Sequence, residues 1–295
     1  MKFSWRYEKE EPRLLKTFLN EQGISRSLLA KIKYQGGWIG VNGVEKTVRY
    51  VLSYLDEVTV IIPDEGEHET LLPDVTPIDI IFEDEHYLIV NKPVGVASIP
   101  AQYHPNGTMA NRVKHYYQSQ NYPNQVIHVV TRLDRDTTGL MLFAKHGYAH
   151  AMMDKELRAG RVTKKYLALV GDDTDKLLPT GKIDFPIKRV ETSIIERTVG
   201  EDGLPSLTEY WLKKRTKDKA LVEVQLHTGR THQIRVHFAA IGCPLIGDEL
   251  YGGRMDCGLE RQALHCHHLS FYHPFTKECL NIFQEMPDDM QNVHL

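Results

Sequence analysis

The chain has 295 residues, of which 41% are hydrophobic and 25% are charged, and its formal net charge at pH 7 is −3. This length suits one large domain and one small domain, with enough apolar residues to form a core. No segment approaches the roughly 20 consecutive apolar residues of a membrane span, and residues 1–6 lack the apolar core of a signal peptide. The composition therefore argues against a membrane or secreted protein.

Cysteine usage agrees with that interpretation. The four cysteines are Cys243, Cys257, Cys266 and Cys279, and no two of them form a C-x-x-C pair. Free thiols in a reducing compartment explain this pattern more simply than a disulfide framework does. We therefore expect a cytoplasmic protein.

The negative net charge is concentrated in one segment. Residues 1–63 carry 10 basic and 7 acidic side chains, residues 64–86 carry 9 acidic and no basic ones, and residues 87–295 carry 26 basic and 23 acidic ones. The acidic segment also contains Pro73 and Pro77, a composition typical of a solvated linker. We predict a small domain at 1–63, an acidic linker at 64–78 and a large domain at 79–295, with both domains mildly basic.

The small domain begins with helical patterns and continues with short strands. Apolar residues at helical spacing between positions 14 and 19 predict a helix closed by Gly23. Ser25 is a suitable N-cap for a second helix that ends near residues 36–37. Strands are expected at residues 38–41 and 58–62, with a turn at Asn42-Gly43 after the first.

The large domain alternates many strands with few helices. Two apolar runs, 126–130 and 140–144, predict buried strands separated by turn residues at 137–139. These patterns indicate an α+β domain with a largely antiparallel sheet. Helices are expected at 147–159 and 234–241, further strands at 162–170, 210–212 and 220–226, and a hairpin or flexible loop at 192–206.

The segment between the two apolar runs places a carboxylate between two arginines. Asp134 has Arg132 two residues before it and Arg135 directly after it. A rigid strand end can hold a catalytic side chain in one orientation, and an arginine within about 4–6 Å would keep the carboxylate ionised. On spacing alone, an ordinary surface ion pair in a solvated turn explains these residues slightly better.

Residues 132–140 resemble the catalytic signature of the RluA family of RNA pseudouridine synthases, with Asp134 at the position of the essential aspartate. Further segments similar to that family occur in its order and, together with the signature, are spread over nearly all of the range 79–283. The resemblance implies an α+β pseudouridine synthase fold with a largely antiparallel or mixed sheet. It also implies isomerisation of specific uridines in ribosomal or transfer RNA. These further segments are residues 84–95, 164–170, 226–237 and 261–265.

The small domain is similar to an S-four-like RNA-binding domain, which often precedes this catalytic domain. The similarity lies in residues 25–29, Gly37, 41–43 and 56–58. Basic side chains on its two helices would contact RNA phosphates, although a solvated helix face is the usual reason for such residues. The basic residues concerned are Arg13, Lys16, Arg26, Lys31 and Lys33.

The resemblance assigns chemistry to three residues. Asp134 would act either as a nucleophile at the sugar or as the base that removes its 2′ proton, and the sequence leaves both routes open. Arg235 would pair with Asp134 and hold it ionised and aimed. Tyr166 would stack on the flipped uracil and help to move the C5 proton. Core packing and a structural ion pair are the ordinary alternatives for Tyr166 and Arg235.

Two further residues would contact the target nucleotide. Arg132 matches the arginine that fills the space left by the flipped base, with simple phosphate binding as its alternative. Leu264 would form an apolar wall of the uracil pocket, or belong to the core. The chain has Thr131 where the family usually has histidine, and Thr138 where it usually has serine.

Other classes of function have less support. A catalytically inactive RNA-binding module for ribosome assembly would not need Asp134, Tyr166 and Arg235 together. A two-carboxylate glycosidase would use Asp134 with Asp136 or another acid, but nothing in the sequence marks a sugar cleft. The histidines, among them His232 and His237, lack zinc-ligand spacing. We expect no metal, no cofactor, RNA as the partner and a monomeric protein.

Overall fold

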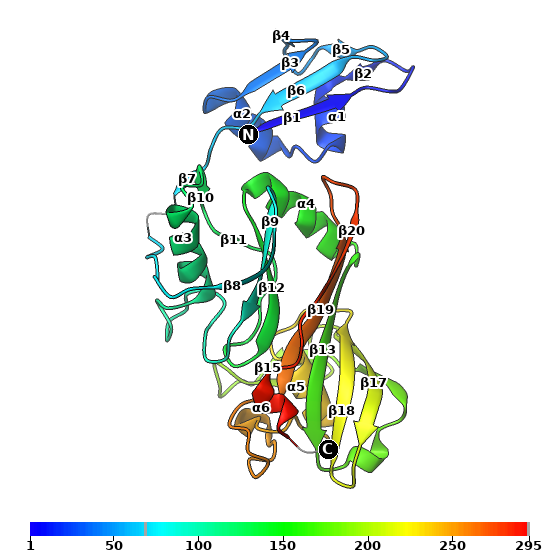
Figure 1. Cartoon of the computed structure of the whole chain (residues 1–295). Helices are drawn as coiled ribbons and strands as arrows, with labels where there is room; N and C mark the ends of the chain where they lie inside the picture. The colour runs from blue at the N-terminus through cyan, green and yellow to red at the C-terminus, as the bar shows by residue number, and fades with distance from the viewer. Residues whose placement is uncertain (68–69, 294–295) are drawn as a thin grey trace.

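The computed structural model describes residues 1–67 and 70–293. The chain forms two lobes, with the small N-terminal lobe above the large lobe in Figure 1. Each lobe is built around its own sheet. No helix in the described part of the chain has the length and apolar character that crossing a membrane requires.

The N-terminal lobe has a four-stranded antiparallel sheet beside two helices, and the predicted helices are confirmed. Ser25 caps the second helix by accepting a hydrogen bond from the Leu28 amide at 3.1 Å. Asn42 and Gly43 have φ angles of 51° and 75°, which form the expected tight turn. The first strand was not predicted. The sheet order is β1 (Lys2–Arg6), β6 (Glu57–Ile61), β3 (Trp38–Val41) and β4 (Val44–Glu45), and α1 (Leu15–Glu21), α2 (Arg26–Tyr34), β2 (Arg13–Leu14) and β5 (Val51–Leu52) complete the lobe.

The two lobes are packed against each other through aromatic side chains. Tyr148 of α4 (Gly147–Arg158) belongs to the apolar core of the small lobe, and Phe275 packs against the same core. The Tyr148 hydroxyl donates to the Gln22 carbonyl at 2.5 Å. The ring of Phe3 in β1 lies edge-on to Tyr148, with 4.9 Å between the centroids. The interface therefore fixes the small lobe on helix α4.

The large lobe is organised by a ten-stranded sheet, largely antiparallel as predicted. Neighbouring strands are antiparallel except β12 and β19, which pair in parallel. Its main path is β14 (Thr180–Asp184), β17 (Leu207–Arg215), β18 (Lys219–Leu226), β13 (Val162–Gly171), β19 (Leu264–Tyr272), β12 (Thr138–Ala144), β9 (Tyr87–Lys92) and β8 (Asp79–Glu83). In addition, β11 (His128–Val129) pairs with β12, and β20 (Cys279–Phe283) pairs with β19.

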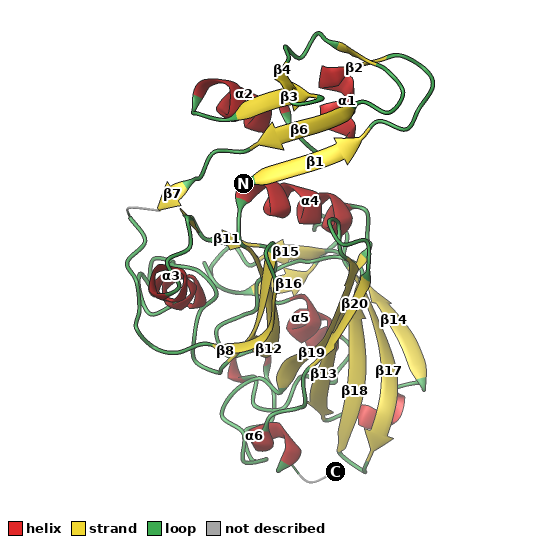
Figure 2. Ribbon diagram, turned by 45° about the horizontal axis from the view of Figure 1, so that its top comes forward, coloured by secondary structure: helices red, strands yellow, loops and turns green. Residues whose placement is uncertain are grey.

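Strand β12 is buried on both faces, which explains its continuous apolar sequence. Met141 and Phe143 pack with α3 (Met109–Ser119), whereas Leu140 and Leu142 face the core that includes α4 and α5 (Gln233–Ala240). Helices α3 and α5 are drawn beside the sheet in Figures 1 and 2. The remaining elements are β7 (Gly66–Glu67), β10 (Asn124–Gln125), β15 (Ile187–Arg189), β16 (Arg197–Val199), α6 (Asp288–Gln291) and the 3-10 turns Thr174–Lys176 and Glu249–Tyr251.

Two local predictions were wrong. The run 126–130 forms only a two-residue strand, because the Val130 and Thr131 amides both bond to the Leu142 carbonyl and the pairing ends there. The turn expected at 137–139 spans residues 134–137 instead, and Gly139 lies inside β12. In the acidic segment 64–78 most described residues are exposed, but Glu65 is partly buried, because its carboxylate accepts the Gly147 amide at 3.0 Å at the start of α4.

Candidate active site

Asp134 lies in the loop that precedes β12, where two strands approach closely. Gly139 has a φ angle of 108°, and a Cβ atom there would lie 2.3 Å from the Cys266 carbonyl oxygen of β19. Only glycine permits this approach. The β12–β19 pairing therefore fixes the C-terminal end of the loop beside the start of β19, the strand that carries Leu264.

Three side chains that are distant in sequence from Asp134 hold the loop backbone on both sides of it. Ser98 Oγ donates to the Leu133 carbonyl at 2.6 Å and accepts the Leu133 amide at 2.9 Å. Lys92 Nζ donates to the Arg135 carbonyl at 2.7 Å, and Arg261 Nη1 donates to the Asp136 carbonyl at 3.2 Å. Since these donors are buried, the loop has one conformation in which Asp134 points into the pocket.

Lys92 is the most buried of these donors, with no exposed surface. Burial lowers the pKa of Lys92 to about 7. Its amine also donates to the Pro93 and Val96 carbonyls at 2.8 and 2.7 Å. Three carbonyl acceptors use all three ammonium protons, so the charged form matches this site.

Arg235 reaches Asp134 from helix α5 and is held by a second carboxylate. Its Nη1 lies 3.4 Å from Asp134 Oδ2, while its Nε and Nη2 bond to the two oxygens of Asp248 at 2.7 and 2.8 Å. The side chains of Arg235 and Asp248 are 8% and 1% exposed. Burial alone would lower the pKa of Arg235, but the Asp248 ion pair raises it. Asp248 therefore keeps the cation charged and oriented toward Asp134.

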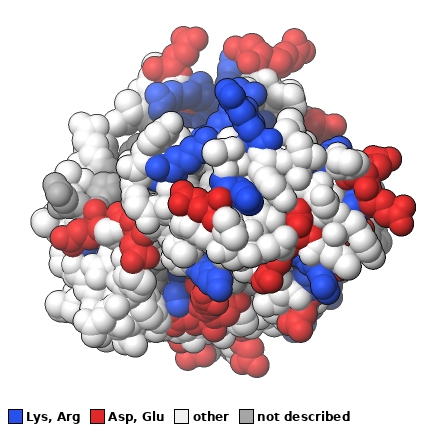
Figure 3. All heavy atoms as spheres, turned by 90° about the horizontal axis from the view of Figure 1, so that it is seen from above, with Lys and Arg blue, Asp and Glu red and all other residues white. Residues whose placement is uncertain are grey.

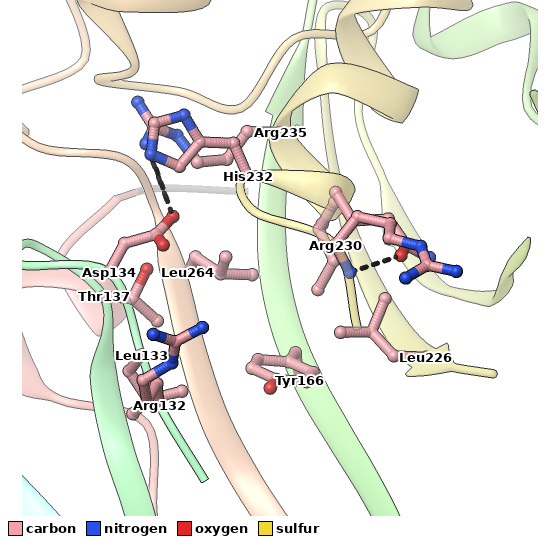
Figure 4. A pocket seen from close by; sticks show the side chains of 12 residues that line it. Arg132, Leu133, Asp134, Thr137, Tyr166, Leu226, Arg230, His232, Arg235 and Leu264 are labelled. Atoms are coloured by element: carbon pink, nitrogen blue, oxygen red, sulfur yellow. Dashed lines mark hydrogen bonds and ion pairs between the residues drawn. The ribbon is translucent and has the colours of Figure 1, made fainter. Parts of the chain in front are cut away.

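The side chains around Asp134 form a pocket with an empty volume of about 360 Å³. Tyr166 and Leu264 lie beside Asp134 in this pocket, and His232 points toward the Asp134 carboxylate (Figure 4). Burial raises the pKa of Tyr166 well above its usual value, so the phenol is neutral at physiological pH. The pocket thus combines one carboxylate, one phenol and apolar walls.

A wider groove of about 1210 Å³ adjoins the pocket and carries uncompensated positive charge. Arg132, Lys164 and Arg230 line it together with Asp134 and Tyr166. None of these three cations forms an ion pair with a described residue, whereas the buried cations Arg235 and Arg261 and the partly buried Lys145 each do. Such a groove suits a polyanion.

Asp136 does not join Asp134 in the pocket. Its carboxylate accepts from the Arg135 guanidinium at 3.0 Å and is absent from the pocket lining. The arrangement therefore lacks the facing pair of carboxylates that a glycosidase uses.

Sequence reasoning missed Asp248, Arg230 and the position of His232. Arg230 and His232 lie within the segment 226–237 that carried the family resemblance, so that segment was a usable signal. His232 lies before the helix expected at 234–241, and the structure shows it as the N-cap of α5 with a left-handed φ of 57°. Asp248 had no sequence signal, because only the turn after α5 returns it to Arg235.

The basic residues predicted for the small lobe lie apart from this pocket. Arg13 lies in strand β2 and not on a helix as predicted, and it is paired with Glu21. The other four basic residues are exposed on α1 and α2. Figure 3 looks down on this lobe and shows Lys and Arg side chains gathered mainly on one side, with acidic side chains both beside them and around the rim. The structure therefore leaves Lys16, Arg26, Lys31 and Lys33 accessible to a ligand.

Comparison with known proteins gives the family. Residues 86–240 match the family described as RNA pseudouridylate synthase. The chain is 45% identical over 280 residues to an uncharacterized RNA pseudouridine synthase, YjbO, of Bacillus subtilis (strain 168), covering 95% of this chain and 97% of that protein. It is 37% identical to ribosomal large subunit pseudouridine synthase D of Yersinia pestis, covering 74% and 70% of the two chains.

A solved structure supports the same assignment. Human RNA pseudouridylate synthase domain containing 1 is 25% identical, with a TM-score of 0.57, and the match covers 72% of this chain and 84% of that one. The chain therefore belongs to the RNA pseudouridine synthase family and is an isomerase. The predicted family, fold class and reaction are confirmed.

Proposed function

We propose that this enzyme converts uridine to pseudouridine in ribosomal RNA, with Asp134 as the reacting carboxylate. The observation that carries the assignment of Asp134 is its place in the pocket, ion-paired to Arg235 and next to Tyr166 and Leu264. The proposed substrate rests on relatives named as ribosomal large subunit pseudouridine synthase D. The unpaired cations of the groove agree with a polyanionic substrate.

The reaction is an isomerisation in which the bond between N1 and C1′ breaks and a bond between C5 and C1′ forms. The proton on C5 is lost and N1 gains one, so no oxidant or reductant is needed. Asp134 acts at the sugar, either as nucleophile at C1′ or as base at the 2′ position. Because Tyr166 is neutral, we assign it to stacking on the uracil and to donating its phenolic hydrogen bond, rather than to acting as a phenolate.

Arg132 has the properties required for base flipping. It extends from the loop that carries Asp134, is exposed, and lines both the pocket and the groove. Extruding a base costs a few kcal/mol, and a planar guanidinium offsets part of that cost by stacking in its place. We therefore propose that Arg132 occupies the space that the uridine leaves, while Leu264 contacts the flipped base.

The small lobe is proposed as a second RNA contact. Lys16, Arg26, Lys31 and Lys33 are exposed on its helices, and the lobe is fixed on α4 by Tyr148 and its neighbours. A fixed position lets the lobe present phosphate contacts at a constant distance from the pocket. We further propose that the enzyme acts as a monomer in the cytoplasm, where its RNA substrate and its free thiols are both accommodated.

The test compares the full-length protein with Asp134→Asn. Unmodified ribosomal RNA and transfer RNA are incubated with each protein, and pseudouridine is measured by mass spectrometry after cyanoethylation. We expect pseudouridine in ribosomal RNA with the wild type and none with the variant, at RNA affinities within a few-fold of each other, because Asp134 contributes little phosphate binding. Equal loss of binding and turnover would contradict the assignment, and product in transfer RNA alone would correct the substrate.

A further inference from the structure

His232 stands beside Asp134 in an unusual backbone conformation. It is the N-cap of α5, with φ 57° and ψ 18°, a left-handed region that few residues other than glycine adopt. Its Nε2 lies 3.9 Å from Asp134 Oδ2, and its side chain is 11% exposed. A strained residue at an active site merits a functional explanation.

The hydrogen bonds behind His232 determine which of its nitrogens carries the proton. Its Nδ1 lies 2.8 Å from the Tyr251 hydroxyl, and that hydroxyl accepts the Arg197 backbone amide at 3.0 Å. Which group donates in the bond to Nδ1 depends on the tautomer of His232. The Tyr251 hydroxyl proton has no other acceptor among the described residues, which favours donation to His232 Nδ1. The imidazole proton is then on Nε2, facing Asp134.

Tyr251 also contacts the other partner of Asp134. The Arg235 guanidinium carbon lies 4.9 Å from the Tyr251 ring centroid, a cation–π distance. The same ring lies edge-on to His232, with 5.7 Å between the centroids. One tyrosine therefore orients both groups that face the carboxylate.

We propose that His232 supplies a fixed Nε2–H donor to Asp134 in the RNA complex, and that Tyr251 is the positioning residue that fixes this tautomer. Active-site hydrogen bonds that are long in the free enzyme shorten when substrate binds. Both Arg235 and His232 approach Oδ2, and Oδ1 makes no hydrogen bond to a described residue. One oxygen is thus held while the other is left to act on the sugar.

Burial lowers the pKa of His232, which agrees with a neutral imidazole between the Asp134 carboxylate and the Arg235 cation. A neutral donor is useful here because a second full charge beside Arg235 would be costly in a buried site. The tautomer is assigned from hydrogen bonds within the protein without RNA. The effect of this tautomer on turnover rests on the proposed function.

The first experiment measures the tautomer by ¹⁵N NMR of the histidine-labelled full-length protein, with the His232 signals assigned by their loss in His232→Gln. We expect a proton on Nε2 and none on Nδ1. Tyr251→Phe keeps the ring but removes the hydroxyl, so we expect His232 to lose its single tautomer. A proton on Nδ1 in the wild type, or an unchanged tautomer in Tyr251→Phe, would overturn the proposal.

The second experiment measures pseudouridine formation. Tyr251→Phe should lower kcat about tenfold, as expected when a hydrogen bond to a charged group is weakened, with KM within about twofold. His232→Gln, which retains an N–H donor, should keep more activity than His232→Leu. His227→Gln is the control, because this histidine pairs with Glu209 outside the pocket.

The outcomes of the second experiment separate two failures. Unchanged kcat in Tyr251→Phe, despite an altered tautomer, would refute a role for the donor. A wild type without turnover would refute the proposed function while leaving the tautomer assignment intact. Thermal unfolding of each variant distinguishes a local effect from misfolding, since equal melting curves with lower kcat can only reflect the site.

Discussion

The two lobes use charged residues in opposite ways. In the small lobe the charged side chains are mostly on the surface, as in the pair of Lys9 and Glu21, which are 63% and 32% exposed. In the large lobe Arg235 and Asp248 are almost completely buried, and Lys92 is buried against three carbonyls. Surface pairs contribute little to stability, whereas a buried charge requires a partner.

The difference in burial of charged residues matches two tasks, attraction of RNA phosphates and orientation of a carboxylate. An exposed cation can follow an RNA backbone without a fixed geometry, because phosphate attraction is long-ranged and non-directional. A reacting carboxylate needs one orientation, so Asp134 is set by a network of buried donors. We therefore expect substitutions in the network to affect folding and turnover, and substitutions on the small lobe to affect affinity.

The largest effect is expected for Asp248→Asn. The change leaves the buried Arg235 guanidinium without its bidentate partner, and breaking a buried ion pair costs about 3–5 kcal/mol. The free energy of unfolding is measured by urea denaturation. Asp256→Asn is the control, because Asp256 pairs with Arg254 at 68% exposure, and we expect a change within about 0.5 kcal/mol there. Similar small losses in both variants would contradict the comparison.

An intermediate effect is expected at the interface between the lobes, where His146 is buried near Phe3. Its Nδ1 caps α4 by accepting the Ala149 amide at 3.1 Å, and its Nε2 lies 3.0 Å from His86 Nδ1. Burial lowers the pKa of His146 to about 3. Between pH 6.5 and 3 the unfolded chain binds a proton that the folded protein does not, so stability falls as the pH falls.

Because of this histidine, we expect the free energy of unfolding to fall by about 1.4 kcal/mol for each pH unit below about pH 6.5. His146→Asn retains a side-chain oxygen to cap the helix but does not titrate, so its stability should depend less on pH. Urea unfolding of both proteins at several pH values between about 7.5 and 5 measures the two slopes. Parallel slopes would show that His146 does not contribute.

The smallest effect is expected for Lys16→Gln on the surface of α1. Loss of one phosphate contact should weaken RNA binding a few-fold and lower the slope of log K against log salt by about one. Titrations at several salt concentrations measure both quantities. Lys217→Gln, an exposed lysine between β17 and β18 at the far end of the large lobe, is the matched control. Equal effects of the two changes would argue against an RNA contact on the small lobe.

Elements with a strong local pattern were predictable from the sequence. The helix starting after Ser25 has its cap and its apolar spacing within ten residues. Helix α4 ends at Arg158, close to the expected residue 159, and Gly160 follows in a left-handed conformation. The strand predicted for residues 126–130 was too long, because apolar residues at a strand end can pack in the core without continuing the hydrogen bonds to the neighbouring strand. The Val130 and Thr131 amides share a single carbonyl, that of Leu142, and local sequence carries no information about that partner.

In the candidate site, too, some residues were predictable from the sequence and others were not. The resemblance around Asp134, Tyr166 and Arg235 named three residues that the fold brings to one pocket from a loop, a strand and a helix. Asp248 and Tyr251 carry no local signal, since they act only where the turn after α5 places them against Arg235. The roles of the buried donors also depend on folding, as in the bond from Lys92 to the Arg135 carbonyl.

The sequence by itself determined the class of protein, the main helices and the antiparallel character of the large sheet, and it pointed to the aspartate that we propose reacts, because motifs and periodicity are local properties. The tertiary structure alone decided which oxygen of Asp134 is held, which donors fix its loop and how the small lobe packs on α4. Those features join residues up to 126 positions apart, as in the bond from Tyr148 to Gln22. Long-range contacts arise only when the chain has folded and excluded water, and there a buried charge or donor must find its partner.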